Sequence, residues 1–343
     1  MIDQVMTWCA ALLQDAPVLA ALAVFALGLC VIAFIWQISR FILWTARRLS
    51  WASRRQKRKN AHGFGIIVSA LSGPKSKQVT DALVLILEKH IGAFTFGGSY
   101  DVIPTPALRA KGSMGLRDMA QKRQDELSGT LMVWGRTYKN SETSIDLMTR
   151  EVDAETGYGT HQRFLLPQDL SDLTAEQERA VAYLFARSFQ PGLADAVGFR
   201  IEKIKPVAEL LEAALEDPGS LPPDTVESIE DDFCTMALHV GDYEDLEYVI
   251  QLRRGRLLSD TQLSRRTQIK ARVDLGRALV GASKRQHNPA RIREAMDHLK
   301  QAIELLREHP AIGLATATSD AVRQGEKMLM AKRRFSVTGG SAI

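Results

Sequence analysis

Clusters of like charge in the C-terminal half are the best candidates for a catalytic or binding site, judged by residue type and spacing. Two groups of acids precede a group of arginines: Glu227, Glu230, Asp231 and Asp232; Asp242, Glu244, Asp245 and Glu247; then Arg253, Arg254, Arg256, Arg265 and Arg266. Paired carboxylates can transfer protons or hold a metal, but acids in the first helical turn also match the helix dipole. A solvated charged face is therefore favoured. Arg253, Arg254 and Arg256 are candidates for binding an acidic segment of a protein partner.

A loop between an apolar run and a helical pattern resembles the end of a phosphate-binding motif. Residues 72–76 read Ser-Gly-Pro-Lys-Ser, whereas the Walker A motif needs Gly, four residues and then Gly-Lys-Ser/Thr. Pro74 precedes the lysine and has no N–H to offer a phosphate. Ser69 stands where the first glycine is required. We predict an ordinary strand-to-helix turn and no bound nucleotide.

The histidines and cysteines form no recognisable catalytic or metal-binding motif. The histidines are scattered, at His62, His90, His161, His239, His287, His298 and His309. They match neither HExxH nor a Cys/His zinc spacing. Cys234 has no obvious histidine and acid partner, so a core position is favoured over a nucleophile. The sequence therefore predicts no catalytic residue, no metal and no cofactor.

An uncharged apolar run over residues 16–36 predicts a membrane-spanning helix. A helix of this length crosses a hydrocarbon core of roughly 30 Å. Asp15 can cap its start and Pro17 suits the first turn. A secretory signal peptide would need basic residues before the run and a shorter apolar stretch, which this sequence lacks. A buried soluble helix is disfavoured because tryptophans flank the run like an aromatic belt: Trp8, Trp36, Trp44 and Trp51.

The segment 37–62 that follows is basic and holds no acid. Positive charge stays in the cytoplasm, so residues 1–15 are expected outside and the later domains inside, at the inner membrane of a bacterium. The expected membrane-interface residues are Trp36, Arg40, Trp44, Arg47, Arg48, Trp51, Arg54, Arg55, Lys57, Arg58 and Lys59. These residues either contact anionic phospholipid head groups or only fix the topology. Nucleic-acid binding is a weaker alternative, since lipid usually explains a basic run beside a membrane.

Residues 63–168 have the pattern of a small α/β domain. Residues 64–71 form an apolar run typical of a buried strand, and apolar residues recur at helical spacing from Ser76. A second helix is expected over 114–127. Further strands are expected at 93–96, 130–138, 143–149 and 161–166. The strands at 130–138 and 143–149 read as a hairpin.

Two phrases in this region resemble the TolB amino-terminal type of α/β domain. They are Gly-Ile-Ile-Val-Ser-Ala-Leu over residues 65–71 and Leu-Met-Val-Trp-Gly over 131–135. Domains of that type occur in bacterial envelope and signalling proteins, often fused to tetratricopeptide repeats. The resemblance implies binding or assembly rather than catalysis.

Residues 169–335 show helical patterns only. Residues 174–177, Thr-Ala-Glu-Gln, form a capping box, and the breaker-rich run 217–223 is the clearest joint. Later segments resemble tetratricopeptide repeats through large and small residues at fixed spacing. The expected repeat-packing residues are Leu275, Gly276, Leu279, Ala295, Leu299 and Ala302. Two repeats are visible where three or more are usual, so other helices or another chain must cap them, which leaves a homo-oligomer open.

Composition and the segments described above together predict one architecture. The chain has 343 residues, with 45% hydrophobic and 24% charged, which excludes a disordered chain and a multi-span membrane protein. We expect a membrane-anchored α+β protein with one transmembrane helix, a small α/β domain, an all-α repeat-like domain and a flexible tail over 336–343. The net charge of +4 comes from segment 37–62, since residues 63–343 are net negative.

Three functions fit this architecture. The first is a non-enzymatic scaffold tethered to the membrane that recruits a protein partner. The second is a sensor whose α/β domain binds a small molecule near the carboxyl ends of the 64–71 and 130–138 strands. The weakest is a hydrolase without a recognisable motif.

Overall fold

The computed structural model describes part of the chain. The described residues are 4, 7, 36, 63–110, 115–139, 142–152, 159–190, 193, 200–259, 263–286 and 288–338. By their contacts, Met1–His62 and Glu126–Ser128 form one unit, and Gly63–Asp125 and Gly129–Ile343 form a second. The sheet and the helices that carry the sites belong to this second unit.

The predicted fold class is wrong in its membrane-spanning helix. Within the ranges given above, no helix is both long and apolar enough to cross a bilayer. The architecture that the structure shows is a five-stranded mixed sheet with α-helices. The run 16–36 that carried the prediction lies outside the described residues except for Trp36, and so does the basic segment 37–62. The lipid contacts expected of segment 37–62, and the orientation and cellular location expected of the protein, stay predictions.

The five strands are hydrogen-bonded in the order β2-β1-β3-β4-β5. Their bounds are β1 Phe64–Ser69, β2 Tyr100–Thr105, β3 Leu131–Thr137, β4 Glu142–Val152 and β5 Gly159–Pro167. Strand β1 is parallel to β2 and β3, whereas β4 is antiparallel to β3 and β5. The hairpin expected from the sequence is therefore confirmed as β3 and β4.

The second strand was predicted in the wrong place. The chain over Ile91–Phe94 forms the 3-10 helix η1, and β2 begins only at Tyr100. Ile91 and Phe94 are both buried, and their separation of three residues puts them on one side of such a turn. Pro104 is tolerated in β2 because this is an edge strand, where a missing N–H need not break the sheet.

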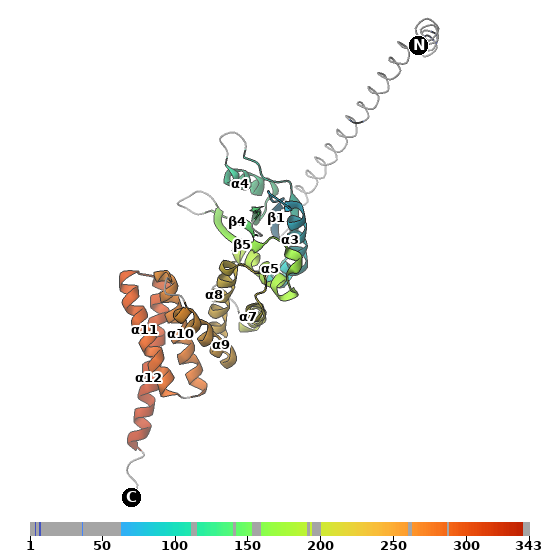
Figure 1. Ribbon diagram of the computed structural model, residues 1–343. Helices are drawn as coiled ribbons and strands as arrows, with labels where there is room; N and C mark the ends of the chain where they lie inside the picture. Colours follow the sequence, from blue (N-terminus) through green and yellow to red (C-terminus); the bar gives the residue numbers. More distant parts are fainter. Residues whose placement is uncertain are drawn as a thin grey trace. The chain divides into compact units, whose positions relative to one another are not determined.

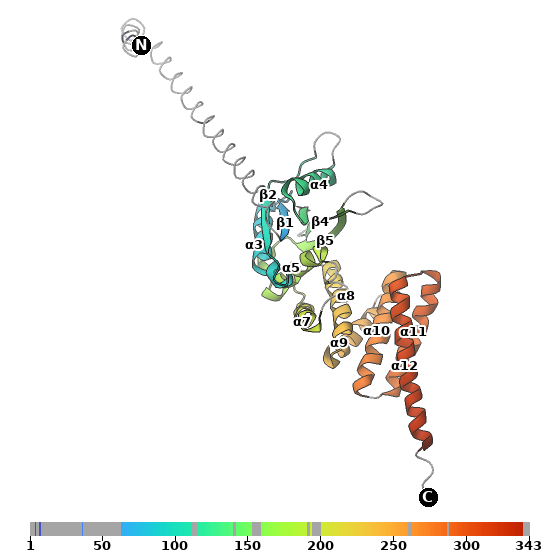
Figure 2. The same cartoon turned by 180° about the vertical axis from the view of Figure 1, so that it is seen from behind.

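Helices cover both faces of the sheet. Helix α3 (Ser76–His90) packs beside α5 (Ala175–Phe189) on the face that presents Ile66, Val133 and Leu147. Helix α4 (Leu116–Leu127) lies on the opposite side from α3, as Figures 1 and 2 show. The predicted capping box is present at the start of α5, where Thr174 accepts from the Gln177 backbone and Gln177 from that of Thr174.

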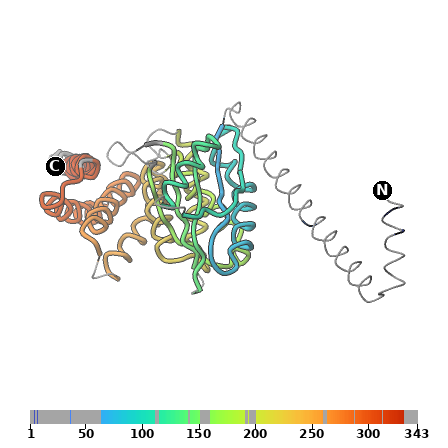
Figure 3. Tube along the Cα trace, turned by 90° about the horizontal axis from the view of Figure 1, so that it is seen from above, coloured from blue at the N-terminus to red at the C-terminus, as the bar shows by residue number. Residues whose placement is uncertain are grey.

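Helices alone follow α5 within the described residues. They are α7 Ile201–Glu216, α8 Pro223–Val240, α9 Tyr243–Ser259, α10 Arg265–Arg285, α11 Pro289–Glu308 and α12 Ile312–Thr338. They succeed one another in chain order from yellow to red (Figure 3). Helix α8 ends at Gly241, whose positive φ of 76° is the left-handed cap that glycine favours. A continuous apolar core runs from the sheet through α5 and α8 to α11.

Helices α10 and α11 pack closely at a glycine. A Cβ on Gly276 would lie 2.6 Å from Cγ of Leu299 and 3.3 Å from the carbonyl oxygen of Ala295. The other expected repeat-packing residues, Leu275, Leu279 and Ala302, are fully buried as well. The small residues thus let the two helix backbones approach, as the spacing suggested. Membership of the tetratricopeptide class stays a prediction.

Candidate functional site: an ionic network and a groove between helices

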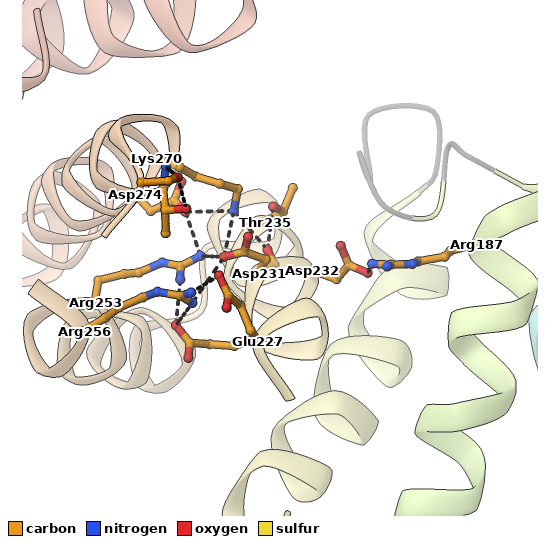
Figure 4. Close-up of polar contacts among 12 residues, drawn as sticks. Arg187, Glu227, Asp231, Asp232, Thr235, Arg253, Arg256, Lys270 and Asp274 are labelled. Atoms are coloured by element: carbon orange, nitrogen blue, oxygen red, sulfur yellow. Dashed lines mark hydrogen bonds and ion pairs between the residues drawn. The ribbon is translucent and has the colours of Figure 1, made fainter. Parts of the chain in front are cut away.

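Two of the arginines singled out from the sequence, Arg253 and Arg256, belong to a buried ionic network (Figure 4). Arg253, on α9, is only 1% exposed. Its guanidinium donates to Glu230 Oε1 and Asp231 Oδ1, both at 2.6 Å and both on α8. It also donates to Asp274 Oδ2 on α10, at 3.0 Å. One planar fork of donors therefore joins three consecutive helices.

Two further cations complete this network. Arg256, one helical turn after Arg253, pairs with Glu227 and lies 3.4 Å from Glu230. Lys270 lies 3.5 Å from Asp231 and 3.2 Å from Asp274. Burial opposes ionisation of Asp231, but Lys270 and Arg253 outweigh it and lower the pKa of this carboxyl. The network accordingly sets three cations, Arg253, Arg256 and Lys270, among the carboxylates of α8 and α10.

Asp232, the residue after Asp231 on α8, faces helix α5 instead. Asp232 pairs with Arg187 of α5 and accepts from Tyr183 Oη at 3.1 Å. Figure 4 shows Asp231 directed toward Arg253 and Asp232 directed toward Arg187. Burial raises the pKa of Asp232, and Arg187 only partly offsets this effect. Burial likewise raises the pKa of the Tyr183 phenol.

The structure therefore occupies all three predicted partner-binding arginines with carboxylates of the same chain. Arg253 is inaccessible and Arg256 is mostly buried. Arg254 is exposed and makes a bidentate contact with Glu294 of α11, with Nη2 at 2.7 and 2.8 Å from the two carboxylate oxygens. The expected solvated charged face is instead an interhelical network. A role of these arginines toward an acidic partner stays a prediction.

A groove of about 280 Å³ opens between α8, α10 and α12, with Leu246 of α9 also in its lining. Its apolar lining includes Leu238, Leu246 and Ala321. Gly281 on α10 makes room for the side chain of Leu246 on α9. A Cβ on Gly281 would lie 3.0 Å from Leu246 Cδ1. Helix α9 can therefore carry a large side chain at this position and still pack on α10.

Basic side chains dominate the polar lining of the groove. Arg277 and Lys284 project from α10, and Asp320 and Gln324 from α12. Arg277 and Lys284 form no ion pair or hydrogen bond with any residue that the structure describes. Sequence reasoning missed them, although Arg277, Gly281 and Lys284 share one helical face by their spacing of four and three. The groove thus offers two unused cations next to one carboxylate.

The loop that resembled a phosphate-binding motif is filled by the protein itself. The Ser72 backbone N–H donates to the Gly135 carbonyl at 3.1 Å, and the Thr137 N–H donates to the Ser72 carbonyl at 2.8 Å. The Thr137 hydroxyl also donates to the Pro74 carbonyl. A Cβ at Gly73, with φ of 106°, would lie 2.3 Å from the Thr137 carbonyl oxygen. The backbone around this turn is therefore engaged with β3, which agrees with a structural turn.

Two histidines lie within hydrogen-bonding distance of carboxylates. His90 Nε2 lies 2.9 Å from Glu178 Oε2, and His161 Nε2 lies 3.0 Å from Asp146 Oδ1. In the part of the chain that the structure describes, no hydroxyl or thiol is hydrogen-bonded to either ring. The same part holds no group of three or more His, Cys, Asp or Glu residues suited to a metal ion. Burial raises the pKa of Cys234 to about 12, so this residue is a neutral core thiol.

Comparisons with protein-family models, curated proteins and solved structures gave no match to this chain. The resemblances to the TolB amino-terminal type of domain and to tetratricopeptide repeats therefore stay predictions that rest on the residues quoted for them.

Proposed function

We propose that this protein is a non-enzymatic scaffold that binds an acidic segment of a protein partner in the groove between α8, α10 and α12. The observation that carries the proposal is the pair of unused cations, Arg277 and Lys284, beside an apolar lining. Residues 63–343 are net negative, so this positive lining stands out from its surroundings. An acidic segment would complement it in charge.

The groove is large enough to hold part of a docked segment. Its volume of about 280 Å³ lies just below the roughly 300–1,000 Å³ of typical ligand pockets. A few side chains of an extended or helical segment fit such a space. Helices α8, α10 and α12 each contribute, so a segment crossing them would contact successive helices of the array.

Crosslinking tests the proposal directly. A photoreactive amino acid replaces Gln324 in the groove, and the 343-residue chain is irradiated in cells. The same amino acid at Lys300, exposed on α11, serves as the matched control. We expect a protein adduct from position 324 that position 300 does not give. The adduct should decrease when Arg277→Glu and Lys284→Glu are combined, because reversed charges repel an acidic segment.

Two outcomes would refute this assignment. One is an adduct at position 324 that survives the double charge reversal, since the cations would then not recognise the partner. The other is an adducted segment that is basic or uncharged when mapped by mass spectrometry. Far-UV circular dichroism of the double variant verifies that the helices are still folded, since neither cation has a partner within the described residues to lose.

A further inference from the structure

A second cavity, of about 500 Å³, lies outside this groove, where η1 and the end of α3 meet α5 and α7. We refer to it as the η1 cleft. Its apolar lining includes Phe94, Phe96, Val207 and Leu210, and its basic lining includes Lys89, Arg179 and Lys203. Among the residues that the structure describes, Glu202 is the carboxylate in the lining. The volume lies within the range typical of small-molecule sites.

The charges of the η1 cleft are only partly neutralised by the protein. Glu178 accepts from Lys89 Nζ at 2.8 Å and contacts His90 at 2.9 Å. Burial opposes its ionisation, but the hydrogen bonds from Lys89 and His90 prevail and lower the pKa of Glu178. One carboxylate thus balances Lys89. Arg179 is exposed and has no ion-pair partner among the described residues.

Phe94 and Phe96 contribute aromatic rings to the η1 cleft. Phe94 is fully buried and packs edge-on against Tyr183 of α5, at 5.7 Å between ring centroids. Phe96 adopts a positive φ of 50°, a backbone conformation that is rare and strained for a bulky side chain. Lys203 Nζ lies 5.1 Å from the centre of the Phe96 ring, close enough for a cation–π contact. Such backbone strain concentrates at binding sites.

We infer that the η1 cleft binds a small organic anion that carries a flat apolar ring. The ring would lie against Phe96 and the apolar residues of α7, and the anionic group would meet Arg179 and Lys203. The two cations come from two different helices, α5 and α7, and both line the cavity. A ligand that bridges them would neutralise charges that the protein leaves unpaired. This site is separate from the groove and does not depend on the proposed scaffold function.

Calorimetric titration of the 343-residue chain with 1-naphthyl phosphate tests the inference. Inorganic phosphate and 1-naphthol, titrated separately, supply the anion and the ring alone. We expect saturable binding of 1-naphthyl phosphate and at least about tenfold weaker binding of either part. Arg179→Gln and Lys203→Gln should each weaken binding about tenfold, because each removes one charge-assisted contact. Lys300→Gln, an exposed lysine on α11, is the matched control and should bind as the unaltered protein does.

Three results would overturn the inference. The first is the absence of saturable binding at millimolar 1-naphthyl phosphate. The second is equal affinity for inorganic phosphate, which would leave the aromatic lining without a role. The third is a loss of affinity in Lys300→Gln that matches the loss in the cleft variants, which would indicate unspecific attraction. Both altered side chains are exposed, so unchanged melting temperatures of the ligand-free variants separate lost binding from lost folding.

Discussion

Replacing Arg253 by methionine should reveal how strongly the ionic network holds the helical array. Methionine keeps an unbranched stem but removes the guanidinium that donates to three carboxylates. Removing one partner of a buried ion pair costs about 3–5 kcal/mol, because the other charge stays buried without compensation. Asp274 is 5% exposed, whereas Asp231 is 31% exposed and keeps part of its hydration. We therefore expect a loss near the lower limit, about 3 kcal/mol of the free energy of unfolding.

The measurement is urea unfolding of both proteins, followed by far-UV circular dichroism at neutral pH and again near pH 4. In the unaltered protein the pKa of Asp231 is lowered, so its contribution exists above the unfolded-state pKa and is lost as pH falls through the folded-state value. In Arg253→Met the buried carboxylates lack their main cation, and protonation relieves the penalty. The difference between the two proteins should therefore be largest at neutral pH and shrink on acidification.

Two controls sharpen this prediction. Arg254→Met removes an exposed ion pair with Glu294 and should cost less than about 1 kcal/mol. Combining Arg253→Met with Asp274→Leu removes both buried partners and should recover part of the loss. If Arg253→Met lies within about 1 kcal/mol of the unaltered protein at neutral pH, the reasoning fails. In that case Arg256, Lys270 or water would compensate the carboxylates without Arg253.

Three further changes test other parts of the molecule. Gly276→Ala should lower the free energy of unfolding by about 1–3 kcal/mol, because its Cβ meets Leu299, whereas Gly255→Ala, with open space around it, should raise it by about 0.5–1 kcal/mol; urea denaturation compares them. With the other two cysteines replaced by serine, Cys234 should react with iodoacetamide at pH 8 only in denaturant, as mass spectrometry would show, and fast labelling of the native protein would contradict its burial. Glu178→Gln should cost about 1 kcal/mol at neutral pH. The pKa of Glu178 is lowered on folding, so this difference in thermal melts should begin to shrink near pH 4.5 and be lost as pH falls through the lower folded-state pKa, and a pH-independent difference would argue against ionisation.

The helical half of the fold was largely predictable because its signals are local. Capping residues, breakers and apolar spacing lie within one turn of the helix boundaries that they set, and Thr174 does cap α5 as predicted. The second strand was missed because Phe94 and Phe96 suggest alternation, while burial of Ile91 and Phe94 follows a helical turn. The choice between these two patterns depends on what packs against η1, which is α5 from a distant part of the sequence.

The ionic network was predictable only in part. Arg253 occupies the apolar stripe of α9, since Leu246, Val249 and Ile250 precede it at helical spacing and are buried. That position signals an inward arginine, which needs buried carboxylates as partners. Their identity depends on how α8, α9 and α10 are rotated against one another, and this rotation is a tertiary property. The spacing of Arg277 and Lys284 puts them on one face of α10, but the groove that they line forms only where α12 lies beside α10.

The adjacent acids of α8 have a mechanical consequence. Consecutive residues on a helix point about 100° apart, so Asp231 and Asp232 reach different neighbours from one turn. Asp231 engages α9 and α10, and Asp232 engages α5, which rests on the sheet. Twisting α8 about its own axis would pull both carboxylates from their cations together. The ion pairs on two sides of α8 therefore oppose its rotation together. A rotation of α8 against α5 would also break the contacts with α9 and α10, and the reverse holds as well.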